Sequence, residues 1–186
     1  GYVIITELND VDEAVKHLSF PLFVKPAKAG DSLGVDEHSL VHNKIELQQK
    51  CISILDEYGP LLVEEYIAGR EFTVLVAANT DEHSCTVFRP VEYLFPEGRS
   101  FKTYALKTSE LHPDCNVPCD DPALDKELRV ATEKIFKGFN GLGYARLDFR
   151  MNATGEIFFL DINFTCSVFY RDGYEGSTDY ILLHDG

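Results

Sequence analysis

Basic residues are scarce in this chain of 186 residues. The sequence contains 17 lysines and arginines against 31 aspartates and glutamates, which gives a net charge of −14 at pH 7. An acidic excess of this size repels nucleic-acid phosphates and anionic lipid surfaces, so we expect neither nucleic acid nor a membrane as a partner. Any phosphate site must therefore be built locally, from a few lysines, arginines and backbone amides.

Long apolar runs, internal repeats and a disulfide-type cysteine pattern are also lacking. No apolar stretch approaches the roughly 20 residues that a membrane-spanning helix needs, and no signal peptide precedes the first expected element. The five cysteines are an odd number, scattered through apolar and loop segments, whereas a secreted disulfide scaffold would be shorter and denser in cysteine. These absences favour a reduced, cytoplasmic protein.

Apolar residues, in contrast, are plentiful. Hydrophobic residues make up 45% of the chain and aromatic residues 12%, which is ample for a packed core and excludes a disordered chain. A chain of this length fits one domain, or two small subdomains that share an interface. Apolar periodicity predicts three helices, with Asp10, Asn43 and Asp121 as their N-cap residues.

Apolar strands are expected between these helices. They are predicted over residues 22–25, 61–67, 71–78 and 85–94. A long polar stretch, residues 96–121, separates the last of these strands from the third helix and reads as a functional loop. Because helices and strands do not alternate strictly, the predicted fold class is α+β.

The most informative segment is a hairpin, predicted from strands 144–151 and 157–163. Side chains alternate along a strand, so Arg146 and Asp148 share one face, and Asp161 and Asn163 share one face of the second strand. A turn of even length would bring all four onto a common face. Two carboxylates and a carboxamide are ligands that Mg²⁺ prefers, and an arginine beside them suits a transferring phosphoryl group. The alternative is an exposed hairpin face with an Arg–Asp cross-strand pair.

Four segments, taken in order and at these distances, resemble a known family. They are residues 20–26, the glycine loop 30–34, residues 63–71 and the hairpin 146–163. Together they resemble the ATP-grasp module of D-alanine–D-alanine ligases, over the chain from Gly1 to Asn163. The resemblance implies an ATP-grasp fold in which two α+β subdomains hold ATP between antiparallel sheets. It places the small central subdomain at residues 1–67 and the large C-terminal subdomain at 68–186, with the N-terminal substrate domain absent.

The resemblance also assigns roles to single residues. Lys25 and Lys107 would contact the ATP phosphates, with Lys107 also catalytic, and Glu71 would take the ribose hydroxyls. The glycine loop would close over the phosphates through Gly30, Ser32 and Gly34. The adenine slot would be lined by Glu64, Glu65, Tyr66 and Ile67. The magnesium ligands would be Asp148, Asp161 and Asn163, and the transition-state arginine would be Arg146.

The implied function is an ATP-dependent carboxylate–amine ligase that uses Mg²⁺, with Mn²⁺ as the alternative ion. A substrate carboxylate would attack the γ-phosphorus, and an amine would then displace phosphate from the acyl phosphate. Its partners would be ATP, a small carboxylate, an amine and the missing N-terminal domain of the same polypeptide, without which the fragment is expected to be inactive. The alternative function is a non-catalytic ATP-binding module of a larger protein.

Three features depart from the ligase pattern. Asp31 stands where a serine is usual, the segment after Asn163 lacks the usual Pro-Gly turn, and the domain that precedes the module in such ligases is expected to be absent. Arg171 follows that segment and would bind a substrate carboxylate there or form a structural salt bridge. A separate alternative is a zinc site built from His112, Cys115 and Cys119, with the distant His83 as the candidate fourth ligand. The His-x2-Cys-x3-Cys spacing is loosely suggestive of zinc, but a fourth ligand with proper spacing is missing.

Overall fold

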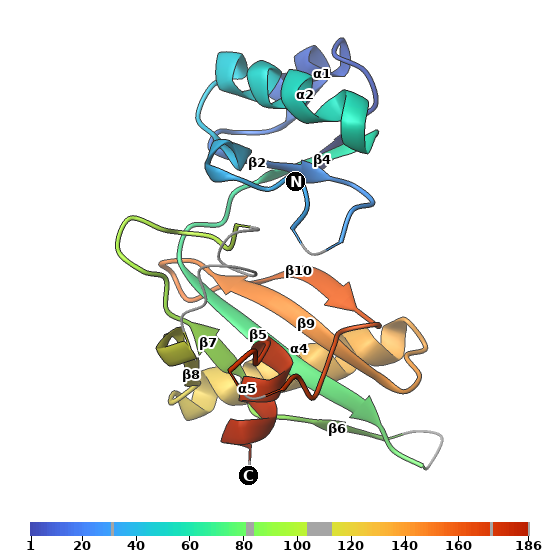
Figure 1. Ribbon diagram of the computed structural model, residues 1–186, viewed down its shortest axis with the longest axis vertical. Helices are drawn as coiled ribbons and strands as arrows, with labels where there is room; N and C mark the ends of the chain where they lie inside the picture. The colour runs from blue at the N-terminus through green and yellow to red at the C-terminus, as the bar shows by residue number, and fades with distance from the viewer. Residues whose placement is uncertain (31, 81–83, 104–112, 172, 186) are drawn as a thin grey trace. The chain divides into compact units, whose positions relative to one another are not determined.

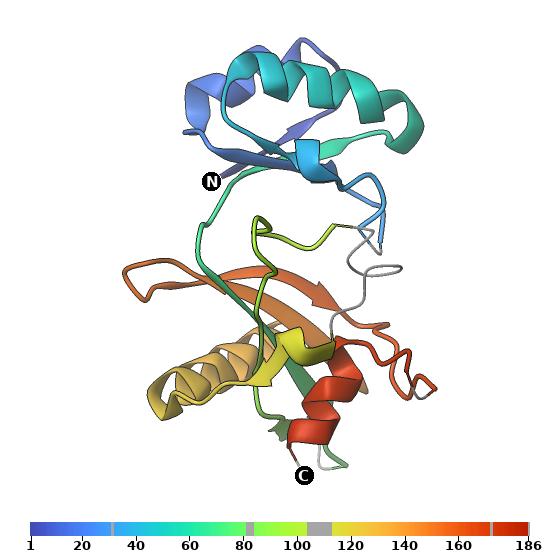
Figure 2. The same cartoon turned by 60° about the vertical axis from the view of Figure 1, so that its left-hand side comes forward.

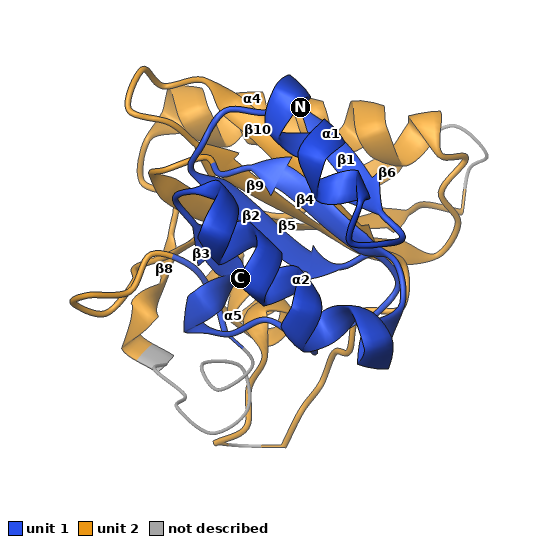
Figure 3. Ribbon diagram, turned by 90° about the horizontal axis from the view of Figure 1, so that it is seen from above, with its two compact units in different colours: residues 1–66, 101–111 blue, residues 67–100, 112–186 orange. Residues whose placement is uncertain are grey.

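Two antiparallel sheets organise the computed structural model, which describes residues 1–30, 32–80, 84–103, 113–171 and 173–185 (Figure 1). Contacts divide the chain into two units, shown in different colours in Figure 3. Unit 1 contains residues 1–66 and the described residues of 101–111, and unit 2 contains residues 67–100 and the described residues of 112–186. Among the described residues, no helix has the length and apolarity that crossing a membrane requires.

Unit 1 is a four-stranded sheet, and both α-helices among its described residues lie on one face of that sheet (Figure 2). The strand order is β1 (Tyr2–Ile5), β4 (Leu61–Glu65), β2 (Leu22–Pro26) and β3 (Leu40–Val41). The helices are α1 (Asp10–His17) and α2 (Lys44–Tyr58), and a short 3₁₀ helix, η1, covers Glu37–Ser39. Alternate strand residues such as Leu22, Val24 and Val63 are fully buried beneath the helices. The opposite face of the sheet therefore carries Phe23, Lys25 and Glu64.

The two helices of unit 1 begin in different ways. The Asn43 side chain accepts a hydrogen bond from the Glu46 amide at 3.0 Å, so α2 begins at the predicted cap. The predicted cap of α1 is wrong. Asn9 occupies that position without a side-chain bond, and Asp10 lies in the first turn instead. The Asp10 carboxylate accepts from the Thr6 and Glu7 amides at 2.8 and 3.0 Å, and so it braces the preceding turn.

Unit 2 is a larger sheet, and its described residues place one α-helix on each face. Its strands run in the order β10 (Ile157–Asn163), β9 (Tyr144–Met151), β5 (Arg70–Ala78), β7 (Val91–Tyr93) and β8 (Asn116–Pro118), and β6 (Cys85–Val87) also pairs with β5. Helix α4 (Pro122–Gly138) packs on the face of Phe72 and Phe149, and α5 (Ser177–His184) packs on the face of Leu75 and Val91. The short helix η2 covers Pro113–Cys115.

One predicted strand of unit 2 is wrong. Residues 85–94 were expected to form a single strand, but β6 and β7 pair with different parts of β5 and are separated at Phe88–Pro90. The pairing shifts by one residue across that gap. Pro90 has no amide hydrogen to donate to a ladder, which accounts for an interruption at this point.

Candidate functional site

The hairpin of β9 and β10 brings four predicted site residues onto one face, but not for the predicted reason. The loop between the paired residues Met151 and Ile157 is 152–156, an odd number of residues, so the expectation of an even turn is wrong. An unbroken ladder from Phe159 opposite Phe149 would set Asp161 opposite Leu147, on the core face.

A β-bulge corrects this register. Leu160 is left without a partner between Phe159 and Asp161, and the pairing then resumes with Asp161 opposite Asp148 and Asn163 opposite Arg146. An extra residue in one strand reverses the face of every side chain that follows it. The bulge therefore places both residues of β10 beside the charged residues of β9.

Arg146 and Asp148 form an ion pair along one strand. Arg146 Nε and Nη2 donate to the two Asp148 carboxylate oxygens at 3.2 and 3.1 Å, and the Thr73 hydroxyl donates to Asp148 Oδ1 at 2.8 Å. The two side chains are 19% and 23% exposed, so the alternative of an exposed cross-strand pair is wrong. The negative charge of Asp148 is the largest influence on the Arg146 guanidinium and raises its pKa, with Asp161 adding to the effect. Arg146 is therefore held as a cation.

The β10 residues present oxygen atoms beside this pair. Asp161 is exposed, and its Oδ1 accepts from the Ile162 amide at 2.8 Å. The Asn163 carboxamide oxygen accepts from the Thr165 amide at 2.9 Å, which fixes the direction of that side chain. Carboxylate and amide oxygens of this kind fit a hard cation such as Mg²⁺, which usually keeps one or two carboxylates and takes the rest of its ligands from water or phosphate.

No richer metal site competes with this one in the described part of the chain. There, no three His, Cys, Asp or Glu side chains gather in a way that would hold an ion. His83 and His112 of the zinc alternative lie outside the described residues. All five cysteines are described, and all are free thiols.

In unit 1, Lys25, which is predicted to bind phosphate, contacts Glu64, which is predicted to bind adenine. Lys25 Nζ lies 2.7 Å from Glu64 Oε1, and the two side chains are 27% and 22% exposed. Lys25 pairs with Leu62 and Phe23 pairs with Glu64, so all of these side chains share the face of the sheet away from the helices. The Lys25 ammonium could bind an anionic group on this face of the sheet, and the Glu64 carboxylate could accept a hydrogen bond from a donor there.

Three aromatic rings lie on the same face. Phe23 and Tyr66 are stacked with their centroids 6.3 Å apart, and Phe101 meets Phe23 edge-on at 5.0 Å. Sequence reasoning singled out Tyr66 but missed Phe101. No local signal marks a phenylalanine in a long polar stretch, and its position against Phe23 depends on contacts far apart in the sequence.

The described residues of the glycine loop, 30 and 32–34, take part in two backbone hydrogen bonds. The Leu33 amide donates to the Gly30 carbonyl at 3.1 Å, and the Val35 amide donates to the Ser32 carbonyl at 3.0 Å. Ser32 and Gly34 both have positive φ, at 59° and 74°. A Cβ atom at Gly34 would lie 2.8 Å from Pro26 Cγ, so only glycine fits there.

The remaining predicted residues are dispersed. Glu65 contacts the amino group of Gly1 at 2.6 Å and shares the face of Leu61 and Val63, while Ile67 is partly buried at the start of unit 2. Glu71 pairs in register with Arg150 and Tyr93, on the same face as Asp148. Lys107 and Asp31 lie outside the described residues. Arg171 is exposed, with its guanidinium 4.1 Å from the centre of the Tyr174 ring.

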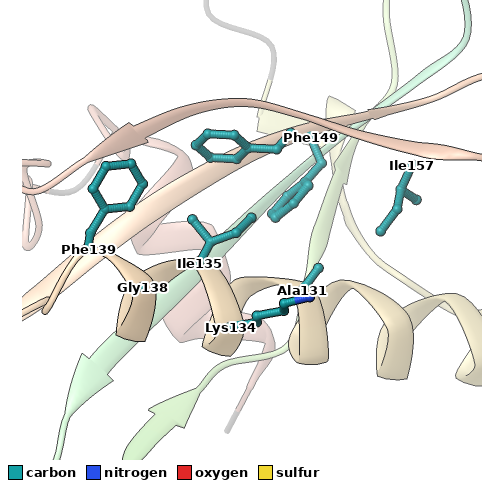
Figure 4. A pocket seen from close by; sticks show the side chains of 8 residues that line it. Ala131, Lys134, Ile135, Gly138, Phe139, Phe149 and Ile157 are labelled. Atoms are coloured by element: carbon teal, nitrogen blue, oxygen red, sulfur yellow. The ribbon is translucent and has the colours of Figure 1, made fainter.

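A pocket of about 540 Å³ lies on the other face of the hairpin (Figure 4). It opens between α4 and the strands β9 and β10, and none of the predicted nucleotide or metal residues lines it. Its lining is Ala131, Lys134, Ile135, Gly138, Phe139, Phe149, Ile157 and Phe159.

Comparison with known proteins decides the family. The sequence profile described as "D-ala D-ala ligase C-terminus" matches residues 5–168, which is most of the chain. The chain belongs to the D-ala D-ala ligase C-terminus family. It is 34% identical over 155 residues to the D-alanine–D-alanine ligase of Acetivibrio thermocellus, a match that covers 82% of this chain and 39% of that protein.

Solved structures agree on the fold. The VanG D-Ala:D-Ser ligase from Enterococcus faecalis is similar with a TM-score of 0.69 and 25% identity, over 88% of this chain and 46% of that one. The D-alanine–D-alanine ligase from Bacillus anthracis, solved in complex with ATP, is similar with a TM-score of 0.61 and 19% identity, over 88% and 48%. The fold is therefore the α+β ATP-grasp fold, as predicted, and the chain spans less than half the length of these relatives.

Proposed function

We propose that this member of the family is the ATP-binding part of an ATP- and Mg²⁺-dependent carboxylate–amine ligase. The observation that carries the proposal is the common face of Arg146, Asp148, Asp161 and Asn163, which the bulge in β10 creates. The names of the relatives, D-alanine–D-alanine ligase and D-Ala:D-Ser ligase, support the reaction class. A module that only binds ATP does not need this whole set, and no feature of the described residues favours the non-catalytic alternative.

In this proposal each unit binds a different part of ATP. Unit 1, as the central subdomain, binds adenine against Phe23, Tyr66 and Phe101, and Lys25 and the glycine loop take the phosphates. Unit 2, as the C-terminal subdomain, holds ribose at Glu71. The assignments of Glu65, Ile67 and Lys107 rest on the resemblance to the family alone.

The hairpin of unit 2 performs the chemistry. Asp148, Asp161 and Asn163 would hold Mg²⁺, with Mn²⁺ as the alternative, and the bound ion would neutralise phosphate charge. A substrate carboxylate oxygen attacks the γ-phosphorus, and the bond from that phosphorus to the ADP oxygen breaks. Arg146, kept cationic by Asp148, stabilises the charge on the transferring phosphoryl group. An amine then attacks the acyl carbon, loses a proton and expels inorganic phosphate.

In this proposal, the substrate-binding part of the ligase lies outside this chain. The relatives are more than twice as long as the matched segment, so we propose that the substrate-binding part lies elsewhere in the polypeptide. Small amino acids are the first candidates for both substrates. We propose a cytoplasmic location, which agrees with five free thiols.

Calorimetry of ATP binding tests the proposal. The native chain should bind ATP with a micromolar Kd that Mg²⁺ strengthens, and Asp161→Ala combined with Asn163→Ala should remove the Mg²⁺ dependence. The matched control is Asp12→Ala combined with Asn9→Ala in unit 1, where Asn9 makes no side-chain cap bond and Asp12 forms an exposed ion pair. A native chain that binds no nucleotide, or a double variant that keeps the Mg²⁺ dependence, would contradict the proposal.

A second measurement separates catalysis from binding. ATP hydrolysis by the polypeptide that contains this chain should increase when a small amino acid such as D-alanine is added. A non-catalytic module would bind ATP and hydrolyse none of it, whatever carboxylate is supplied.

A further inference from the structure

Lys50 is a buried lysine to which neither the sequence nor the family likeness assigns a role. It lies on α2 in unit 1, and its side chain is only 1% exposed. Its ammonium group donates to the Gly34 carbonyl at 2.9 Å and to Asp36 Oδ1 at 2.8 Å. Both acceptors belong to the segment that leaves the glycine loop.

These two acceptors lie at the end of the glycine loop and just beyond it. Gly34 is its last residue and, at φ 74°, packs against Pro26, the residue that follows Lys25. The Asp36 carboxylate also accepts from the His38 amide at 2.9 Å and so caps η1. The Lys50 ammonium group therefore bonds the end of the loop to helix α2. This contact lies close to the strand that carries Lys25.

Stability alone does not explain a buried charge here. An ammonium group removed from water is costly unless hydrogen bonds and an opposite charge compensate it, and an apolar side chain of the same size is often as stable. The charged group instead fixes the orientation of the segment that it bonds. It bonds two specific oxygen atoms, and backbone amides can bind phosphate only when they point toward it.

We propose that Lys50 is a positioning residue for the glycine loop, which it holds so that the loop amides face the phosphates of ATP. The inference rests on the proposed function. Lys50 itself does not touch the nucleotide. Its removal should weaken the binding of the phosphates while leaving adenine and ribose binding intact.

Lys50→Met tests this inference, because methionine keeps the length and apolar stem of the side chain and removes only the ammonium group. Calorimetry should show the Kd for Mg²⁺–ATP raised about tenfold, as expected if the displaced loop loses about one hydrogen bond to phosphate, and the Kd for adenosine changed by less than about twofold. Exchange of the Leu33 and Val35 amides, which donate the two backbone hydrogen bonds of the loop, should be faster. Lys44→Met is the matched control, since Lys44 lies on the same helix in an exposed ion pair with Asp12.

A second variant keeps the test decisive if the first folds poorly. Asp36→Asn removes the charged acceptor but leaves Lys50 bonded to Gly34, and it should raise the Kd for ATP about threefold without affecting adenosine. ATP binding unchanged in both variants overturns the role of Lys50 and leaves the proposed function standing. Equal weakening of ATP and adenosine marks a structural lysine and also overturns it. A native chain that binds neither ligand overturns the proposed function and this inference together.

Discussion

Thr73 supports the charged centre of unit 2 from the neighbouring strand. It is 2% exposed, and its hydroxyl donates to Asp148 Oδ1 at 2.8 Å. Asp148 also accepts both bonds from Arg146, so its orientation depends on the two donors together. These donors thus orient the Asp148 carboxylate, which we propose as a Mg²⁺ ligand.

Thr73→Val should therefore cost stability. Valine matches the shape of threonine but donates nothing, so the free energy of unfolding should fall by about 1 kcal/mol. Thr86→Val is the control, because the Thr86 hydroxyl bonds Asn79 at 2.9 Å in an exposed position, and its effect should stay within about 0.5 kcal/mol. Urea unfolding measures both, and equal losses would show that burial of the Thr73 bond does not matter.

The thiols should differ in reactivity by their burial. Cys51 is fully buried in the core of unit 1, and burial raises its pKa from 9.0 to about 11. At pH 8, iodoacetamide should label the partly exposed Cys115 well before Cys51, as mass spectrometry of peptides would show. Because the folded state disfavours the thiolate, the stability that protonated Cys51 contributes is present below pH 9 and declines between pH 9 and about 11. Labelling of Cys115 and Cys51 at the same rate would contradict the expected difference in thiol reactivity.

At the scale of single elements, local signals were enough for two helices. Asn43 and Asp121 cap α2 and α4 as predicted, because a side-chain oxygen reaches an amide only two or three residues away. The buried face of α4 was less well predicted. The apolar spacing of the sequence predicts a core face that ends at Phe139. Phe139 is 58% exposed and Phe136 is 2% exposed instead, because the position of the sheet, and not the helix alone, selects the buried face.

The junction at Gly69 offers a sharp test of close backbone approach. A Cβ atom there would lie 2.0 Å from the Met151 carbonyl oxygen, and the φ angle is 141°. Gly69→Ala should therefore lower the free energy of unfolding by at least about 3 kcal/mol, since the clash is with backbone that cannot move cheaply.

Gly59→Ala is the control for that substitution. Gly59 also has positive φ, at 72°, but a Cβ atom there would meet nothing within 4 Å. With ψ at −143°, Gly59 lies outside the left-handed α region, in a conformation that residues with a Cβ atom rarely adopt, so the loss should be about 1–3 kcal/mol and smaller than the loss at Gly69. Similar losses for the two variants in chemical unfolding would show that backbone conformation, and not close approach, decides the effect at Gly69.

At the scale of the whole molecule, the apolar cores are built within units. Leu61 and Val63 belong to the core of unit 1, whereas Leu147 and Phe149 belong to the core of unit 2. Residues that share a core usually lose protection together when that core is weakened.

Leu61→Ala should therefore act mainly on unit 1. Leu61 is fully buried, and its truncation should cost about 2–5 kcal/mol, seen as faster amide exchange in β2 and β4 while β5 and β9 stay protected. Leu147→Ala, also fully buried, is the reciprocal variant and should expose β5 and β9 instead. Loss of protection in both units from either change would mean that the chain unfolds as one cooperative structure.

The sequence by itself determined the fold class, the family and the capped helices. The alternation of Arg146 with Asp148 and of Asp161 with Asn163 was also legible, because side-chain direction along one strand is a local property. For the same reason a loop was expected at residues 30–34, where Ser32 and Gly34 adopt positive φ.

Only the tertiary structure decided how these pieces meet. The bulge at Leu160, the ion pair of Lys25 with Glu64, the approach of Phe101 to Phe23 and the bonds from Lys50 to the loop end all join residues whose relation depends on strand register or packing. Register is a property of two strands together, and a shift of one residue reverses a face without changing either local pattern. That is why the four hairpin residues could be named from the sequence while the reason for their common face could not.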